Sequence, residues 1–170
     1  GNAVAMTTSI ESAFGNRQLV HGFLLNNQLT DFSWVPEADR KPVANRVEPG
    51  KRPRSSMAPT MVFDGDRLML ALGSPGGHSI INYVAETLVA VIDWRMDIHN
   101  AVALPHAGSR NGPTEIERGT ALETLVPALR QMGHTVRVQP ETSGLHGIQR
   151  VPSGWIGGAD PRREGLALGG

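Results

Sequence analysis

The fold is decided by the stretch Thr60–Trp94, TMVFDGDRLMLALGSPGGHSIINYVAETLVAVIDW. Its first part has two apolar runs around Asp64-Gly65-Asp66, a turn that tolerates positive φ, and it predicts a β-hairpin over 60–72. After the turn Gly73-Ser74-Pro75-Gly76-Gly77, apolar residues recur at helical spacing and predict an amphipathic helix over 78–94. A tight, glycine-rich turn therefore joins a buried strand to the N-terminus of a helix.

The N-terminal third is predicted to hold two strands and a long loop. Small, Val and Thr residues over 3–9 and the run 22–25 indicate strands, with Phe14-Gly15-Asn16 as the turn between them. Residues 34–54 hold four prolines, many charges and no apolar period, which predicts a loop. A loop of that length is uncommon without a function.

Two further helices are predicted after the central stretch. Asp97 is in position to cap a short helix over 98–104. Thr120 and Glu123 fit a capping box for a second helix, which Pro127 should kink or start late.

The C-terminal residues alternate as strands over 135–138, 145–151 and 154–158. The order of strands, hairpin, helices and strands predicts a mixed α/β (α+β) layered fold. At 170 residues, the chain fits one domain covering residues 1–170.

Composition excludes several classes of partner. Lys plus Arg equal Asp plus Glu at 16 each, so no net field favours nucleic acid or an anionic membrane surface. The apolar run Ile80–Ile92 is interrupted by polar residues and predicts a core helix rather than a membrane span. The absence of cysteine excludes disulfides and thiol nucleophiles, and it leaves both periplasm and cytoplasm open.

The segment Ser74-Pro75-Gly76-Gly77-His78 is the strongest candidate for chemistry. It places unshielded backbone amides at the positive end of a helix, where they could hold an anion or an oxyanion. It lacks the Lys of a P-loop and the three-glycine spacing of a dinucleotide site, so a phosphate interpretation is weak. Taken alone, the segment could also be only a tight turn. The six histidines have no metal-ligand spacing.

This segment and four others together closely resemble the small subunit of gamma-glutamyltranspeptidases. They occur in the family's order and at close to its spacing over nearly the whole chain. The four others are GNAVA at 1–5, LNNQ with DFS at 25–33, PGKRPRSSM at 49–57 and GADPRR at 158–163.

The resemblance implies an N-terminal-nucleophile hydrolase, a four-layer αββα sandwich built jointly with a large subunit cut from the same precursor. It implies no metal and no cofactor. The cut frees a Thr whose own α-amine is its base, and the family has this Thr about ten residues before the position of Gly1. Thr7 and Thr8 are internal and cannot replace it. We therefore expect the 170-residue chain alone to be inactive.

The resemblance also implies roles for eight residues. The amides of Gly76 and Gly77 would stabilise the tetrahedral oxyanion, and the Ser9 hydroxyl would assist the nucleophile. A γ-glutamyl donor such as glutathione carries an α-ammonium and an α-carboxylate, which need acceptors and donors. The ammonium matches Glu11, Gln28 and Asp31, and the carboxylate matches Ser55 and Ser56, with an Arg from the large subunit.

Departures from the family pattern leave alternatives open. Glu11 replaces a typical Asn and would favour a cationic group on the substrate, whereas Arg54 replaces an apolar residue. Cephalosporin acylases of the same superfamily remove a glutaryl-type chain without an ammonium, and they are the second hypothesis. The third is a non-catalytic fragment that pairs with itself through an exposed apolar face.

Overall fold

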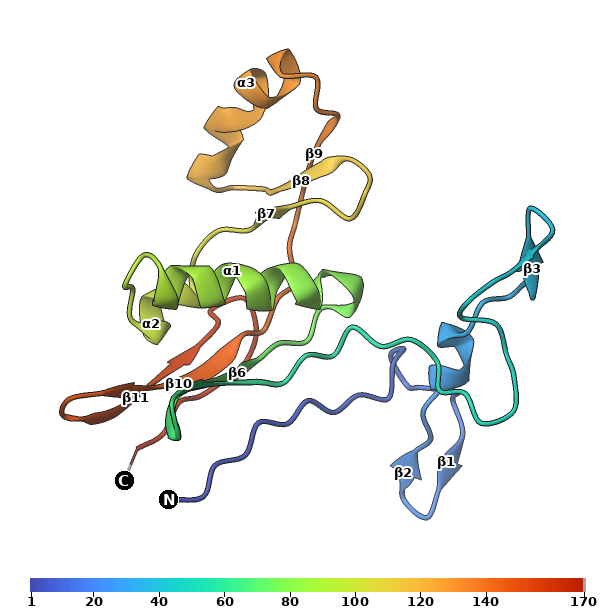
Figure 1. The fold of residues 1–170 in the computed structure, drawn as a ribbon, viewed down its shortest axis with the longest axis horizontal. Coiled ribbons are helices and arrows are strands. Elements are labelled where there is room, and N and C mark those ends of the chain that lie inside the picture. Colours follow the sequence, from blue (N-terminus) through green and yellow to red (C-terminus); the bar gives the residue numbers. More distant parts are fainter. Residues whose placement is uncertain (170) are drawn as a thin grey trace. The chain divides into compact units, whose positions relative to one another are not determined.

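The structure is a computed structural model that describes residues 1–169 (Figure 1). It consists of two compact units. We call Thr8–Ser55 the loop unit, and Gly1–Thr7 with the chain from Ser56 onward the sheet unit. The single domain over 1–170 that the sequence predicts stays a prediction.

A four-stranded antiparallel sheet is the base of the sheet unit. The strands are β5 (Thr60–Asp64), β6 (Arg67–Gly73), β10 (His146–Val151) and β11 (Gly154–Ala159), in the order β11-β10-β6-β5. β6 is a central strand, and its residues become buried toward the glycine-rich turn that follows. The predicted hairpin and the last two predicted strands are confirmed.

Two helices cover one face of this sheet (Figure 1). A short 3₁₀ turn, η2 (Gly77–Ser79), leads directly into α1 (Ile80–Ile92). The second helix, α2 (Ile98–Ala101), is capped by Asp97, whose side chain accepts a hydrogen bond from the Asn100 amide, as the sequence predicts. The helix ends at Ala101, three residues before the predicted end at 104. Within residues 1–169, no helix has the length and apolar character needed to cross a membrane.

The core lies between these helices and the sheet. Burying an aliphatic or aromatic side chain of this kind contributes about 1.5–3 kcal/mol relative to leaving it exposed. Because the apolar face of α1 recurs at helical spacing, the same residues that predict the helix also anchor it on the sheet. The buried cluster comprises Leu70, Leu72, Ile80, Tyr83, Val84, Ala90, Val91, Ile98, Ala101, Val102 and Leu145.

A smaller three-stranded sheet follows α2 in the chain. Its strands are β7 (Ala107–Gly108), β8 (Thr114–Glu117) and β9 (Val136–Gln139). β7 pairs with β8 antiparallel, and β8 pairs with β9 parallel. The sequence predicts β9 but neither β7 nor β8. β8 has the sequence TEIE, and because both of its carboxylates are buried, it lacks the apolar pattern by which a buried strand is predicted.

A helical segment connects β8 to β9. It starts as a 3₁₀ helix, η3 (Ala121–Leu125), and becomes α-helical only at α3 (Val126–Gln131), with a proline in the first turn. The delayed start predicted from Pro127 is confirmed. The capping box is wrong, because the Thr120 hydroxyl donates to the Glu117 carbonyl and Glu123 accepts from the Gly119 amide.

The loop unit has little regular structure. It holds a two-residue hairpin of β1 (Leu19–Val20) and β2 (Phe23–Leu24), followed by the 3₁₀ helix η1 (Gln28–Asp31). The predicted strand over 22–25 is thus present but short. The predicted strand over 3–9, which the boundary between the two units divides, is wrong. These residues are in no strand of the structure, since sequence preference alone forms no ladder.

The rest of the loop unit is the predicted 34–54 loop. It contains one small hairpin that the sequence does not predict, formed by β3 (Glu37–Ala38) and β4 (Lys41–Pro42). Its turn residues, Asp39 and Arg40, both have positive φ, at 50° and 60°. That is the conformation that two-residue hairpin turns require.

Candidate active site

The glycine-rich turn has the conformation that its sequence predicts. Gly76 has φ of 137° and Gly77 has φ of 56°, both in the region that favours glycine. At Gly76 a side chain is also excluded by contact, since a Cβ would lie 2.6 Å from Cε2 of Tyr83. A Cβ on Gly77 would meet no heavy atom within 4 Å, so only its backbone conformation demands glycine.

The two glycines stand where the helix begins. The Gly76 carbonyl accepts from the Ser79 amide at 3.1 Å, and the Gly77 carbonyl accepts from the Ile80 amide. Their carbonyls therefore join the helical pattern, whereas their own amides precede it. N–H groups at this end of a helix carry the positive end of the helix dipole, so this turn is suited to stabilising a negative oxygen.

The turn is supported on its N-terminal side by the segment before β10. The Gly144 amide donates to Ser74 Oγ at 3.3 Å, and Ser74 is itself buried. Pro75 packs so closely on Gly144 that a Cβ there would lie 2.7 Å from Pro75 Cγ. The path of the turn is thus fixed by its neighbours as well as by its own torsions.

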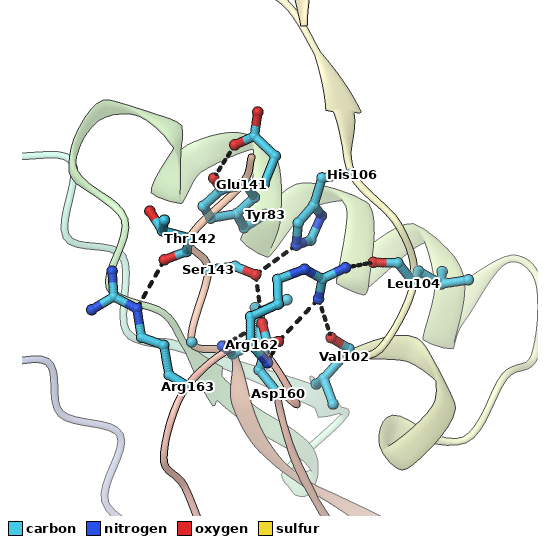
Figure 2. A network of polar contacts seen from close by, with 12 residues as sticks. Tyr83, Val102, Leu104, His106, Glu141, Thr142, Ser143, Asp160, Arg162 and Arg163 are labelled. Carbon is cyan, nitrogen blue, oxygen red and sulfur yellow. Dashed lines mark hydrogen bonds and ion pairs between the residues drawn. The ribbon is translucent and has the colours of Figure 1, made fainter. Parts of the chain in front are cut away.

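A buried chain of polar contacts lies next to this support (Figure 2). His106 Nδ1 is 2.5 Å from Glu86 Oε2, and its Nε2 is 2.7 Å from Ser143 Oγ. The Ser143 hydroxyl donates to Asp160 Oδ2 at 2.5 Å. Ser143 is completely buried and His106 is 3% exposed. The sequence does not predict these polar contacts, because His106 is 20 residues from Glu86 and 37 from Ser143.

The polar contacts continue from Ser143 through Asp160 and Arg162 to Glu117 in β8. Arg162 binds Glu117 in bidentate fashion, with Nε 2.7 Å from Oε1 and Nη2 2.8 Å from Oε2, and its Nη1 lies 2.9 Å from Asp160 Oδ1. Burial acts to raise the pKa of Asp160, but hydrogen bonds from Ser143, from the Arg162 and Leu145 amides and from the Arg162 guanidinium outweigh it and lower the pKa. Both carboxylates therefore stay ionised beside the guanidinium, whose own pKa is raised despite burial.

Tyr83 connects the polar chain to the turn. Its ring lies against Gly76 on one side and stacks on the His106 ring, with centroids 4.3 Å apart and an interplanar angle of 36°. Its hydroxyl donates to Glu141 Oε2 at 2.5 Å. Burial, and then the Glu141 carboxylate, raise the pKa of Tyr83 to about 12. The phenol is therefore a neutral hydrogen-bond donor in the physiological range.

The loop unit holds Glu11 in a fixed conformation. Glu11 has φ of 72°, a left-handed conformation in which Glu is uncommon. Its Oε2 accepts from the Ser12 hydroxyl at 2.5 Å and from Nδ2 of Asn27. Asn27 Oδ1 in turn accepts from the Ser12 amide at 3.0 Å. Asn27 thus ties the segment that carries Glu11 to the start of η1.

Gln28, the first residue of η1, is held by Ser9. Its Nε2 donates to the Ser9 carbonyl at 3.0 Å, and the Ser9 hydroxyl accepts from the Glu11 amide at 2.8 Å. The Oε1 atom of Gln28 is buried and has no hydrogen-bond partner within the described part of the chain. Buried acceptors without partners are rare in native proteins and mark either strain or a missing ligand.

The remaining candidate residues are distributed between the two units. Asp31 ends η1, and its carbonyl accepts from Asn45 Nδ2 at 2.6 Å. Ser55 is the last residue of the loop unit, and Ser56 is the first residue of the second segment of the sheet unit. The structure thus brings the predicted Ser9, Glu11, Gln28 and Asp31 into one unit and puts Ser56, Gly76 and Gly77 in the other.

Comparison with known proteins gives this arrangement a family. The gamma-glutamyltranspeptidase family model matches residues 1–170. The chain belongs to the gamma-glutamyltranspeptidase family. The glutathione hydrolase proenzyme of Bacillus subtilis is 36% identical to it over 174 residues, covering 99% of this chain and 29% of that protein. The chain therefore spans less than a third of the length of this curated relative.

Solved structures of the family share the fold. The structure of a Helicobacter pylori gamma-glutamyltranspeptidase T380A mutant matches with a TM-score of 0.87 and 34% sequence identity, covering 96% of this chain and 95% of that one. This likeness confirms the α+β fold class. An acylase is also similar, since the ACY 1 proenzyme of a Pseudomonas strain is 33% identical over 162 residues, covering 94% of this chain and 28% of that protein.

Proposed function

We propose that this gamma-glutamyltranspeptidase family chain is one subunit of an enzyme that transfers or hydrolyses the γ-glutamyl group of γ-glutamyl amides such as glutathione. The observation that carries the proposal is Gln28. Its amide is oriented by the Ser9 carbonyl, and its buried Oε1 is an acceptor with no partner among the described residues. An ammonium group supplies the donor that such an atom needs, and a γ-glutamyl substrate has one.

The substrate's two charged ends divide between two groups of residues. Glu11, Gln28 and Asp31 would accept hydrogen bonds from the α-ammonium, and the hydroxyls of Ser55 and Ser56 would donate to the α-carboxylate. An Arg of the large subunit would pair with the same carboxylate. Holding both ends positions the γ-carbonyl, which is the kind of orientation that lowers the entropic part of a barrier.

The reaction proceeds through an acyl-enzyme. The Thr that family resemblance places before Gly1 attacks the γ-carbonyl carbon, and its α-amine takes the hydroxyl proton. The amides of Gly76 and Gly77 donate to the resulting oxyanion. Collapse breaks the amide C–N bond, and the leaving amine takes the proton from the α-ammonium of Thr. Water or an amine acceptor then attacks the ester and frees the Thr hydroxyl.

The proposed roles of these residues imply a partner subunit. The site would be complete only with the large subunit, which would supply the Arg. Support comes from the relatives' names, since the Bacillus subtilis glutathione hydrolase is named as a proenzyme.

The second candidate function is that of a glutaryl-type acylase. The similarity to the ACY 1 acylase proenzyme favours it. An acylase acting on a glutaryl chain has no ammonium to bind and gives Gln28 no ligand. The partnerless Oε1 therefore argues for the γ-glutamyl substrate over the glutaryl one.

Replacement of the Gln28 acceptor tests the proposal. In the two-subunit enzyme, Gln28→Met keeps the side chain's length and removes the acceptor. We expect KM for γ-glutamyl p-nitroanilide to rise at least about tenfold, because the variant loses one charge-assisted hydrogen bond to the substrate. The exposed neighbour Leu29→Met is the matched control. An unchanged KM in Gln28→Met would contradict ammonium binding at this residue.

A further inference from the structure

We propose that His106 is a positioning residue for the oxyanion amides of Gly76 and Gly77, acting through Tyr83 on one side of the turn and through Ser143 on the other. The inference rests on the proposed function, because it takes these two amides as the oxyanion donors.

The first link runs through a ring stack. The Tyr83 ring is 3% exposed and fills the space that a side chain on Gly76 would need, 2.6 Å from an ideal Cβ. The His106 ring stacks on Tyr83 with a centroid separation of 4.3 Å. A shift of the His106 ring therefore moves the surface on which Gly76 rests.

The second link runs through the segment before β10. His106 Nε2 is 2.7 Å from Ser143 Oγ, and the next residue, Gly144, donates its amide to Ser74 at 3.3 Å and packs against Pro75. Ser143 cannot drift independently, because its hydroxyl also donates to buried Asp160 at 2.5 Å. His106 thus connects the two supports of the turn, one under Gly76 and one beside Ser74. Figure 2 shows His106 with Tyr83 and Ser143, the two residues of these supports that it contacts.

His106 is held in place both through its ring and through its backbone amide. Glu86 Oε2 lies 2.5 Å from Nδ1, and the His106 amide donates to Glu117 Oε2 at 2.8 Å. Glu117 is in turn bound by Arg162 through two hydrogen bonds. A buried polar network of this kind is costly when one member is lost, and it rigidifies its surroundings when complete.

Rigidity here has a catalytic consequence. Oxyanion donors work only when they lie about 2.7–3.1 Å from the position of the developing charge, and removing one costs about 10²–10³ in kcat. Displacing both by a fraction of an ångström weakens transition-state binding and leaves ground-state binding, made by the side chains proposed to hold the two charged ends of the substrate, unchanged. Loss of His106 should therefore lower kcat without raising KM.

The test uses the two-subunit enzyme with γ-glutamyl p-nitroanilide. We expect His106→Gln to lower kcat about 10- to 100-fold with KM within about twofold of wild type. Affinity for a boronic acid analogue of the γ-glutamyl group, whose tetrahedral adduct puts an oxygen at the oxyanion position, should fall in parallel with kcat. Ile98→Val, completely buried in the same core where it packs against Gly147 and Gly158, controls for loss of stability alone.

A second pair of variants keeps the test decisive if His106→Gln folds poorly. Tyr83→Leu removes the ring under Gly76 and should lower kcat and boronate affinity in the same way. Tyr83→Phe keeps the ring and should restore most of the lost kcat, although it removes the hydrogen bond to Glu141.

The outcomes separate the inference from the function on which it rests. If wild type does not cleave the anilide, the proposed function fails. If wild type cleaves it but His106→Gln and Tyr83→Leu keep wild-type kcat and boronate affinity, the positioning role alone is overturned. Equal losses in the Ile98→Val control would overturn it as well, because they would trace the effect to stability.

Discussion

The ring of Tyr83 lies directly against the α-carbon of Gly76, so close that a methyl group there would be 2.6 Å from Cε2. The contact ties the first turn of α1 to the loop before it, since Tyr83 lies on the buried face of that helix. The conformation of the proposed oxyanion loop is thus dictated by a side chain seven residues further along the chain.

This contact predicts unequal effects at the two glycines. Gly76→Ala must displace the Tyr83 ring, whereas Gly77→Ala meets open space and bears only the cost of positive φ, about 1–2 kcal/mol. We expect Gly76→Ala to show the larger loss in both thermal stability and kcat. Parallel melting curves and anilide kinetics measure the two losses. Equal losses would mean that the Tyr83 contact does not constrain the turn.

Acid should destabilise the protein through Asp160. Its folded-state pKa is lowered, so its ionised form stabilises the fold above the ordinary carboxyl pKa of about 3.9, and this contribution is lost as the pH falls below that value. We expect Asp160→Asn to be less stable than wild type at pH 7 and to lose less on acidification. Denaturant unfolding at pH 7 and near pH 3 checks this. Identical pH slopes for the two proteins would count against a lowered pKa.

Tyr83 should resist ionisation. Its pKa is raised to about 12, against about 10 for a free phenol, because burial and Glu141 disfavour the phenolate. The neutral form stabilises the folded state until the pH rises past about 10. The difference in phenolate absorbance between wild type and Tyr83→Phe isolates this residue. A titration step near pH 10 in that difference, with the protein still folded, would contradict the burial.

Asn27 should matter although the sequence gives it no role. It donates to Glu11 and accepts from the Ser12 amide, so it fixes a residue proposed to face the substrate's ammonium. We expect Asn27→Ala to raise KM for γ-glutamyl p-nitroanilide about tenfold, the value of roughly one net hydrogen bond. The exposed neighbour Asn26→Ala should leave KM unchanged. If both variants behave alike, Asn27 does not position Glu11.

The parts of the fold that the sequence predicts are those with local signals. The β5–β6 hairpin has a turn dipeptide between two apolar runs, and α1 has an uninterrupted helical period. β8 has neither signal. Its two glutamates are buried because they pair with Arg110 and Arg162, and these arginines are either distant in the sequence or outside regular structure. The predicted strand over 3–9 shows the opposite error, a local preference without a partner strand.

The candidate site divides in the same way. The tight turn at Gly76 and Gly77 is predictable, because the glycines directly precede the helical spacing of apolar residues that begins at Ile80. The network of polar contacts around His106, which supports this turn, is not predictable from the sequence. His106 meets Glu86 and Ser143 only because α1, the loop between α2 and β7 and the segment before β10 converge in the folded chain. No spacing in the sequence encodes that convergence.

The most direct test of the central claim compares two substrates on the wild-type two-subunit enzyme. γ-Glutamyl p-nitroanilide and glutaryl p-nitroanilide differ only in the α-ammonium that Glu11, Gln28 and Asp31 are proposed to bind. We predict that kcat/KM is at least about 100-fold higher for the γ-glutamyl compound, because the glutaryl chain leaves buried acceptors such as Gln28 Oε1 unpaired. Equal or better cleavage of the glutaryl compound would contradict it and favour an acylase.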